Sequence, residues 1–360
     1  MKLRVFTLLI VLGVLLPSVE VALADRGMIP VQSNVSVYEP GQKAIVAWNG
    51  TTEILILSTD VFANSVTKVL EILPLPSNPS KVELASFDSF TVIQELIWSH
   101  VPSILRSGFY GDGKDVNIVF HEKIGMHDIT IVEATDVSGL VEWIGNFLAA
   151  NGISQNLSIE GFESVLSDYL LRAFRFFVLD LIELSPERKS AEPILYEFTT
   201  ESLYYPLLIT TPVGGDGLVQ LFVVTDGILQ DRYEPFEKGM YRSLFHWEPI
   251  QFRLTRDEIV RIDSRIAVLF KDKACITALV YDGPLGTLVE DLAIRQLLPL
   301  FMGDLDANGI VNIVDVAIVA RAFAAYAGQA RWNSLADVNY DMLIDILDLT
   351  TVAKDFGRPA

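Results

Sequence analysis

The sequence predicts an α+β main domain with a mostly antiparallel sheet, followed by a small all-α module built from two calcium loop–helix repeats. Three observations predict this arrangement. Apolar runs of strand length, rich in β-branched and aromatic residues, recur between residues 36 and 281. Helical periods gather in residues 86–172 and do not alternate with the strands. Residues 303–357 then repeat one acidic pattern twice.

The first residues have the features of an export signal. Lys2 and Arg4 precede an apolar run at residues 5–16, and Ala22-Leu23-Ala24 offers the small residues that a signal peptidase accepts. We therefore expect a signal peptide at residues 1–24 and a secreted, extracellular or surface-associated protein. The alternative is an uncleaved membrane anchor, for which the run is short.

The main domain, residues 25–298, contains turn, strand and helix signals. Glu39-Pro40-Gly41 is expected to be a turn. Helices are expected from Asp88, over residues 140–148 up to Asn151-Gly152, from Ser158, and over residues 286–296. The expected strands are residues 36–38, 44–48, 53–58, 68–75, 116–120, 129–134, 176–184, 193–198, 203–210, 218–225, 265–270 and 274–281.

Composition limits the function classes. The net charge of −19 disfavours binding to nucleic acid or to anionic membranes. The one cysteine, Cys275, lies in an apolar run and is expected in the core. No nucleophile, phosphate-loop or dinucleotide motif is present in the sequence, so the main domain is expected to be non-catalytic.

Three weaker signals in the main domain favour structural interpretations. His121-Glu122 and His127 form the nearest approach to a metal cluster, but one buried and one solvated histidine is the commoner arrangement. Residues 111–115 read as a polar surface loop. Asp180 and Glu183 lie in an apolar strand at odd spacing, so they are expected on opposite faces of it.

A resemblance supports this view of the main domain. The stretch from Val37-Tyr38-Glu39-Pro40-Gly41 to residues 73–76, with Ile182-Glu183-Leu184-Ser185-Pro186 and Tyr204-Tyr205-Pro206-Leu207, resembles a family of secreted prokaryotic domains of unknown function. It covers about residues 28–230 and implies an exported domain without known catalytic residues.

The repeat carries the strongest chemical signal. One copy runs from Asp304 to Asp315, and the other runs from Asp337 to Asp348, 33 residues later. Both copies place oxygen-bearing side chains at positions 1, 3, 5, 9 and 12, the ligand spacing of a twelve-residue calcium loop with a backbone carbonyl at position 7. After each loop an apolar stripe predicts a helix that packs on its counterpart, formed by Val316, Val319, Ala320 and Phe323, then by Leu349, Val352, Ala353 and Phe356.

This segment resembles the type I dockerin, a calcium-dependent docking module whose partner is a cohesin domain of a scaffold or surface protein. We assign residues 299–360 to it; the apolar residues 297–302 replace a flexible linker, so the module is expected to abut the main domain. Met342 occupies the position where copy one has Gly309, and a positive φ is usual there. The resemblance implies two Ca²⁺ sites, with ligands Asp304, Asp306, Asn308, Ile310, Asn312 and Asp315, then Asp337, Asn339, Asp341, Leu343, Asp345 and Asp348.

The same resemblance implies a docking face. Cellulosomal dockerins carry Ser or Thr at loop positions 10 and 11, whereas this chain has aliphatic residues, which predicts a more apolar face. Alternatively, these aliphatic residues pack on the main domain. The implied partner contacts are Ile313, Val314, Arg321, Ile346, Leu347 and Lys354.

Three functions follow from these features. The leading one is an exported, non-catalytic protein that its dockerin attaches to a cohesin-like partner on a cell surface or extracellular assembly. The first alternative is a secreted glycan hydrolase carried to a complex, which requires two carboxylates across a cleft. The second is a calcium repeat that only stabilises the C-terminus and binds no partner.

Overall fold

The computed structural model describes residues 29–30, 37–63, 67–100, 127–153, 160–184, 189–190, 192–212, 215–229, 233–242, 247–271, 273–299, 303–306, 310–333, 335–339 and 341–357. The expected signal peptide, the expected strand at residues 116–120, the loop at residues 111–115 and His121-Glu122 lie outside them. Among the described residues, no helix has the length and apolar character needed to cross a membrane.

A nine-stranded sheet forms the centre of the main domain, in the order β13-β17-β11-β2-β3-β9-β5, with β16 beside β17 and β8 beside β3. β11 and β2 pair in parallel, and the other pairs in this sheet are antiparallel. The mostly antiparallel arrangement is confirmed. Its strands are β2 (Val37–Trp48), β3 (Thr52–Ala63), β5 (Lys81–Leu84), β8 (Lys189–Ser190), β9 (Ile194–Thr199), β11 (Asp216–Thr225), β13 (Glu237–Lys238), β16 (Gln251–Thr255) and β17 (Lys273–Pro284).

A second, four-stranded antiparallel sheet packs on the first, in the order β1-β4-β7-β6. Its strands are β1 (Ile29–Pro30), β4 (Thr67–Leu75), β6 (His127–Glu133) and β7 (Phe176–Leu184). Three two-stranded ribbons complete the strands: β10 (Leu203–Tyr205) with β18 (Leu292–Ile294), β12 (Gly227–Ile228) with β19 (Leu298–Pro299), and β14 (Met240–Arg242) with β15 (Trp247–Pro249).

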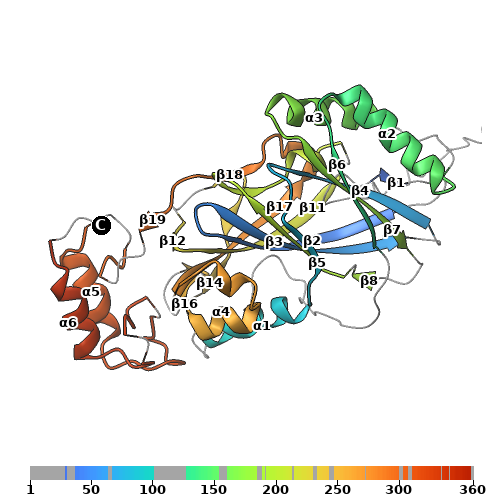
Figure 1. Cartoon of the computed structure of the whole chain (residues 1–360). Coiled ribbons are helices and arrows are strands. Elements are labelled where there is room, and N and C mark those ends of the chain that lie inside the picture. The colour runs from blue at the N-terminus through green and yellow to red at the C-terminus, as the bar shows by residue number, and fades with distance from the viewer. Residues whose placement is uncertain are drawn as a thin grey trace, which may run out of the picture.

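The main domain has four layers (Figure 1). Helices α1 (Asp88–His100) and α4 (Arg256–Ile262) cover the outer face of the large sheet. Helices α2 (Val137–Ala150) and α3 (Glu160–Leu171) cover the outer face of the small sheet. Alternation along the strands separates the cores: Val46 and Leu55 face the small sheet, whereas Ile45 and Ile54 face α1 and α4.

Four local predictions are wrong in whole or in part. The expected strand at residues 203–210 is a strand only over Leu203–Tyr205, and Leu208–Thr210 form a 3₁₀ helix. β2 continues through Pro40 with a register shift between Tyr38 and Gly41 instead of turning there. Because β11 pairs with β2 only from Gln42 onward, this end of β2 has no neighbour on that side among the described strands and tolerates proline. Residues 265–270 contain a 3₁₀ helix, Ile266–Val268, because Asp263 accepts a hydrogen bond from the Arg265 amide (2.8 Å) and turns the chain.

The expected helix at residues 286–296 is instead a 3₁₀ turn, Leu285–Thr287, followed by β18. The Asp291 carboxylate accepts hydrogen bonds from the Tyr169 hydroxyl (2.7 Å) and from the backbone amide of Leu207 (2.9 Å). These bonds hold the segment around Asp291 against β10, and the backbone of β18 pairs with that of β10. Cys275 is buried as expected, and burial raises the pKa of its thiol to about 12.

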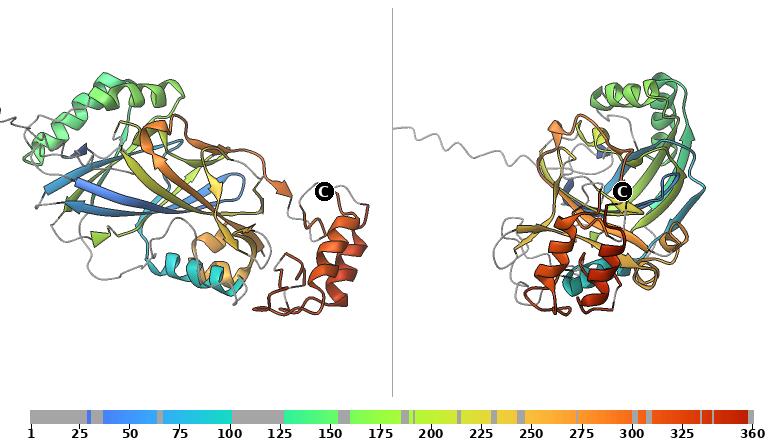
Figure 2. Two further views of the ribbon diagram at one scale, coloured as in Figure 1. Left: turned by 180° about the vertical axis from the view of Figure 1, so that it is seen from behind. Right: turned by 90° about the vertical axis from the view of Figure 1, so that its left-hand side faces the viewer.

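The C-terminal module has its own core. Helices α5 (Ile313–Ala322) and α6 (Ile346–Lys354) lie side by side at one end of the molecule (Figure 2). Their core contains only residues of this segment, with Val319, Val352 and Trp332 among the buried side chains. The chain reaches the module directly from β19, which pairs with β12 of the main domain. The apolar lead-in is therefore anchored to the main domain as far as Pro299.

Candidate metal centre

Both helices of the module begin with the same hydrogen-bonded cap. Asn312 precedes α5, and its side chain accepts a hydrogen bond from the Val314 amide (2.7 Å). Asp345 precedes α6 and accepts one from the Leu347 amide (2.7 Å). Asn and Asp are favoured at this position because their side chains satisfy amides that the first helical turn leaves free. Loop position 9 is therefore the helix cap in both copies, and the last three loop residues form the first turn of the helix.

The acid at position 12 closes each loop. Asp315 and Asp348 are completely buried. Each is the third residue of its helix, and its side chain completes the capping box with the N-cap residue. Each carboxylate accepts three backbone hydrogen bonds from equivalent positions of its loop. The donors to Asp315 are the amides of Leu305 (2.6 Å), Asp306 (3.1 Å) and Asn312 (2.8 Å), and those to Asp348 are the amides of Val338 (2.8 Å), Asn339 (3.3 Å) and Asp345 (2.8 Å).

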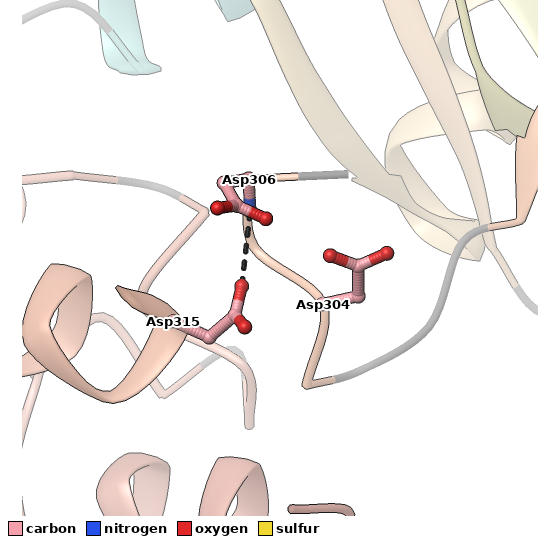
Figure 3. A group of neighbouring side chains, drawn as sticks. All are labelled: Asp304, Asp306 and Asp315. Carbon is pink, nitrogen blue, oxygen red and sulfur yellow. Dashed lines mark hydrogen bonds between the residues drawn. The ribbon is translucent and has the colours of Figure 1, made fainter. Parts of the chain in front are cut away.

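Copy one gathers three carboxylates. Oxygens of Asp304, Asp306 and Asp315 lie within 4.8 Å of one another (Figure 3). Two oxygens that bind one Ca²⁺ at about 2.4 Å are at most about 5 Å apart, so this spacing fits a shared calcium ion. Asn312 donates to the carbonyl of Ile310 (3.2 Å), which brings the predicted ligands of positions 7 and 9 together. Asn308, the predicted ligand at position 5, lies outside the described residues.

Copy two folds its acids around its own backbone. Asp337 accepts hydrogen bonds from the amides of Asp341 (3.2 Å) and Met342 (3.0 Å). Asn339 and Asp341 cap the next turns, accepting from the amides of Asp341 (3.0 Å) and Leu343 (2.9 Å) respectively. The loop is thus a series of side-chain-to-backbone turns. Among the described acids, three carboxylates lie within 4.8 Å of one another in copy one and not in copy two.

The carboxylates of copy two repel one another. The pKa of Asp337 is raised to about 6: burial is the largest cause, the negative charges of Asp348 and Asp341 also raise it, and the hydrogen bonds from the amides of Met342 and Asp341 oppose the rise. A divalent cation between these carboxylates would reverse the repulsion. Both loops therefore offer hard oxygen donors and excess negative charge, which suit Ca²⁺.

Met342 has the backbone conformation that its loop position predicts. Its φ is +66°, in the left-handed region that glycine usually occupies. A residue with a Cβ pays about 1 to 2 kcal/mol for this conformation. The side chain itself is 66% exposed, so burial does not offset the cost.

Replacing Met342 by glycine is therefore expected to stabilise the module. Met342→Gly removes the Cβ clash, and we expect the free energy of opening of α6 to rise by about 1 kcal/mol. Hydrogen exchange of the α6 amides in the full chain, measured in chelator, gives this quantity. Met342→Ala is the matched control, since it removes the side chain but keeps the Cβ; equal protection in the two variants would contradict the prediction.

The two repeats also hold each other's loops. The amide of Gly357, just after α6, donates to the carbonyl of Val311 in loop one (2.7 Å). The amide of Ala324, just after α5, donates to the carbonyl of Ile344 in loop two (2.7 Å). Both donors have positive φ, +80° and +62°, and both bonds repeat at a spacing of 33 residues. Each helix end therefore fastens the opposite loop, and neither repeat is complete alone.

The predicted partner-facing residues lie on the surface. Ile313, Val314, Ile346 and Leu347 are 48 to 67% exposed, and Arg321 and Lys354 are exposed near the other ends of their helices. The aliphatic residues at positions 10 and 11 therefore do not pack on the described part of the main domain.

Two aromatic residues of the predicted buried stripe lie on the surface. Phe323 is 40% exposed and Phe356 is 55% exposed, so this part of the prediction is wrong. Because α5 ends at Ala322 and α6 at Lys354, both residues lie in the turns beyond the helices. Ala320 and Ala353 of the same stripe are also exposed.

In the main domain, the histidine of the weak His121-Glu122 and His127 signal that the structure describes pairs with an acid. His127 lies on β6, and its Nδ1 is 2.6 Å from Oδ2 of Asp180 on β7. Asp180 is buried and Glu183 is exposed, so the prediction of opposite faces is confirmed. An acid inside an apolar strand indicates a special site at Asp180, but its partner His127 lies 53 residues earlier on another strand, so the sequence did not reveal the pair.

The comparisons with known proteins give a family and weak structural likenesses. No curated protein matches the chain. The crystal structure of baculovirus P35 is similar with 14% identity, a TM-score of 0.38, and coverage of 62% of this chain and 76% of that one. A mutated baculovirus P35 after caspase cleavage is similar with 10% identity, a TM-score of 0.37, and coverage of 71% and 100%. At these values nothing is transferred from either structure.

A family model described as "Uncharacterized protein conserved in bacteria (DUF2330)" matches residues 22–356. The match runs through the main domain and both acidic loops. It is broader than the region at residues 28–230 that resembles secreted prokaryotic domains. The chain therefore belongs to this uncharacterised bacterial family.

Proposed function

We propose that residues 303–357 form a dockerin-like module that binds two Ca²⁺ ions and attaches an exported main domain to a cohesin-like partner on a cell surface or extracellular assembly. The observation that carries this proposal is the duplication of the whole loop: the same acids, caps and closing hydrogen bonds recur 33 residues apart. In each copy the acid that completes the helix cap also stands at loop position 12, where calcium loops place their last ligand.

Calcium is the ion that the donor set favours. The candidate ligands are carboxylate, amide and carbonyl oxygens, with no histidine or cysteine among them. The expected ligands are the twelve residues given above, and copy two offers one more carboxylate than copy one. In the proposal the ion neutralises the crowded acids and fixes both helices in one relative orientation.

The docking face is the apolar surface at the helix starts. Ile313, Val314, Ile346 and Leu347 expose large side chains, which is unusual for one small helix pair unless a partner covers them. Arg321 and Lys354 supply one basic group on each helix. A partner with a hydrophobic patch bordered by acidic groups would complement this surface. Exposure of these residues argues against a repeat that only stabilises the C-terminus.

The full chain, used as bait against the envelope fraction of its source bacterium, tests this function. We expect capture of a protein with a cohesin-like domain in calcium, loss of that capture in EGTA, and direct binding when the captured protein is purified. Calorimetry of the full chain should give two Ca²⁺ ions bound per molecule. Capture that persists in EGTA, or no capture in calcium, would overturn the docking proposal, and absence of calcium binding would overturn the metal sites.

A further inference from the structure

A pocket of about 530 Å³ opens between the two sheets of the main domain. This volume lies within the range of small-molecule sites. Strands β5 and β9 of the large sheet supply one wall, β6 of the small sheet supplies the other, and Glu192 precedes β9. The lining residues are Val82, Glu83, Leu84, His127, Ile129, Ile131, Glu192 and Ile194.

A buried polar group borders this pocket. His127 lines it, and the side chain of Asp180, which holds the His127 ring, is only 2% exposed. Glu71 on β4 lies directly opposite Asp180 in the sheet and is 1% exposed. Two buried acids, Asp180 and Glu71, therefore lie behind His127 on this side of the pocket, and the Asp180 carboxylate holds the imidazole in one orientation.

The two glutamates of the lining differ in their contacts. Glu83 is bound to Arg265 at 3.0 Å on the rim. Oε2 of Glu192 is buried, and no described residue donates a hydrogen bond to it. A buried carboxylate oxygen without a donor is unfavourable, and a ligand that brings an N–H would satisfy it.

The remaining lining sets the class of ligand. Five side chains are aliphatic, and no lysine, arginine or aromatic residue is among the described lining residues. The absence of cations and the excess of acids disfavour anionic ligands. An aromatic cage, the usual receptor for a quaternary ammonium group, is also missing from this lining. We propose that the pocket binds a primary aliphatic amine, with its ammonium group on Glu192 and its alkyl chain against the isoleucines.

Methyl NMR of the isoleucine-labelled full chain tests this proposal. n-Hexylamine should shift the methyl signals of Ile129, Ile131 and Ile194. 1-Hexanol and hexyltrimethylammonium should bind at least about tenfold more weakly than n-hexylamine, because neither of them offers a charged N–H. Nα-acetyl-lysine methylamide forms a second arm, which distinguishes a lysine side chain of another protein from a free amine. Binding in either arm supports the site, and binding in neither overturns it.

Two variants make the test specific. Glu192→Gln keeps the shape but removes the charge, and is expected to weaken n-hexylamine at least about tenfold. Glu142→Gln, on the exposed side of α2, is the matched control and should leave affinity unchanged. Ile131→Trp, at a position 38% exposed on the rim, should block the pocket in a chain that stays folded. Equal affinity for amine and alcohol, or unchanged binding in Glu192→Gln and Ile131→Trp, would overturn the proposal.

Discussion

Asp315→Asn is expected to abolish calcium binding at the first loop while helix α5 stays in place. Asparagine keeps one carbonyl oxygen, which can accept the amides of Leu305 and Asp306, but its NH2 group replaces the oxygen that accepts the Asn312 amide, and the charge is lost. Because Asp315 lies at position 12, where calcium loops bind bidentately, we expect at least about a hundredfold loss of affinity. Calorimetry of the full chain should then report one Ca²⁺ ion bound in place of two.

Asp315→Ala separates the structural role of this residue from the metal role. It leaves three backbone amides without their acceptor, and the one of Leu305 belongs to a buried residue, so the cost is about 3 kcal/mol even in chelator. Hydrogen exchange of α5 amides in EGTA should rise accordingly. Asp257→Asn, at an exposed acid in the first turn of α4, is the control. Two bound ions in Asp315→Asn would contradict the assignment of loop one.

The loops were predictable because their information is local. Twelve consecutive residues determine which atoms can converge, so the acids at position 12 and the left-handed position at Met342 could be predicted from spacing, whereas the capping roles of Asn312 and Asp345 were not predicted. The reciprocal bonds of Gly357 and Ala324 could not. They depend on how the two repeats pack, and the alanine gives no sign of its positive φ.

Strands were predictable where an apolar run is long, as in residues 176–184, which are β7. The errors occur where one acid makes tertiary hydrogen bonds. Asp291 binds residues more than 80 positions away, and this contact overrides the helical period around it. Helix α4 was missed because its seven residues are too few to show a period, although Thr255 and Glu258 form a capping box.

The polar residues of the pocket could not be predicted from the sequence. His127 and Asp180 meet because β6 and β7 pair in one register, and a shift of one residue would turn one of them away from the other. Glu192 lines the same pocket from the segment that precedes β9 of the large sheet. No spacing rule connects two strands of one sheet with a segment that leads into another. The sequence could indicate only that a charge inside an apolar strand needs a partner.

Replacing both Ile313 and Ile346 by aspartate is expected to abolish partner capture without loss of calcium. The two residues are 67% and 54% exposed and open their helices, where an acid is tolerated by the helix dipole. Stability should therefore change by no more than about 0.5 kcal/mol. On the partner side, each aspartate places an unpaired charge in the centre of an apolar contact, which costs several kcal/mol of binding free energy.

The single variants make the prediction sharper. Because the face is duplicated, Ile313→Asp leaves the second copy intact, and Ile346→Asp leaves the first. If either copy can engage the partner, each single variant keeps measurable capture and only the double variant loses it. Val268→Asp, at a main-domain residue that is 81% exposed, is the control for added surface charge. Capture by the double variant at the wild-type level, with two calcium ions still bound, would show that the apolar helix starts are not the docking face.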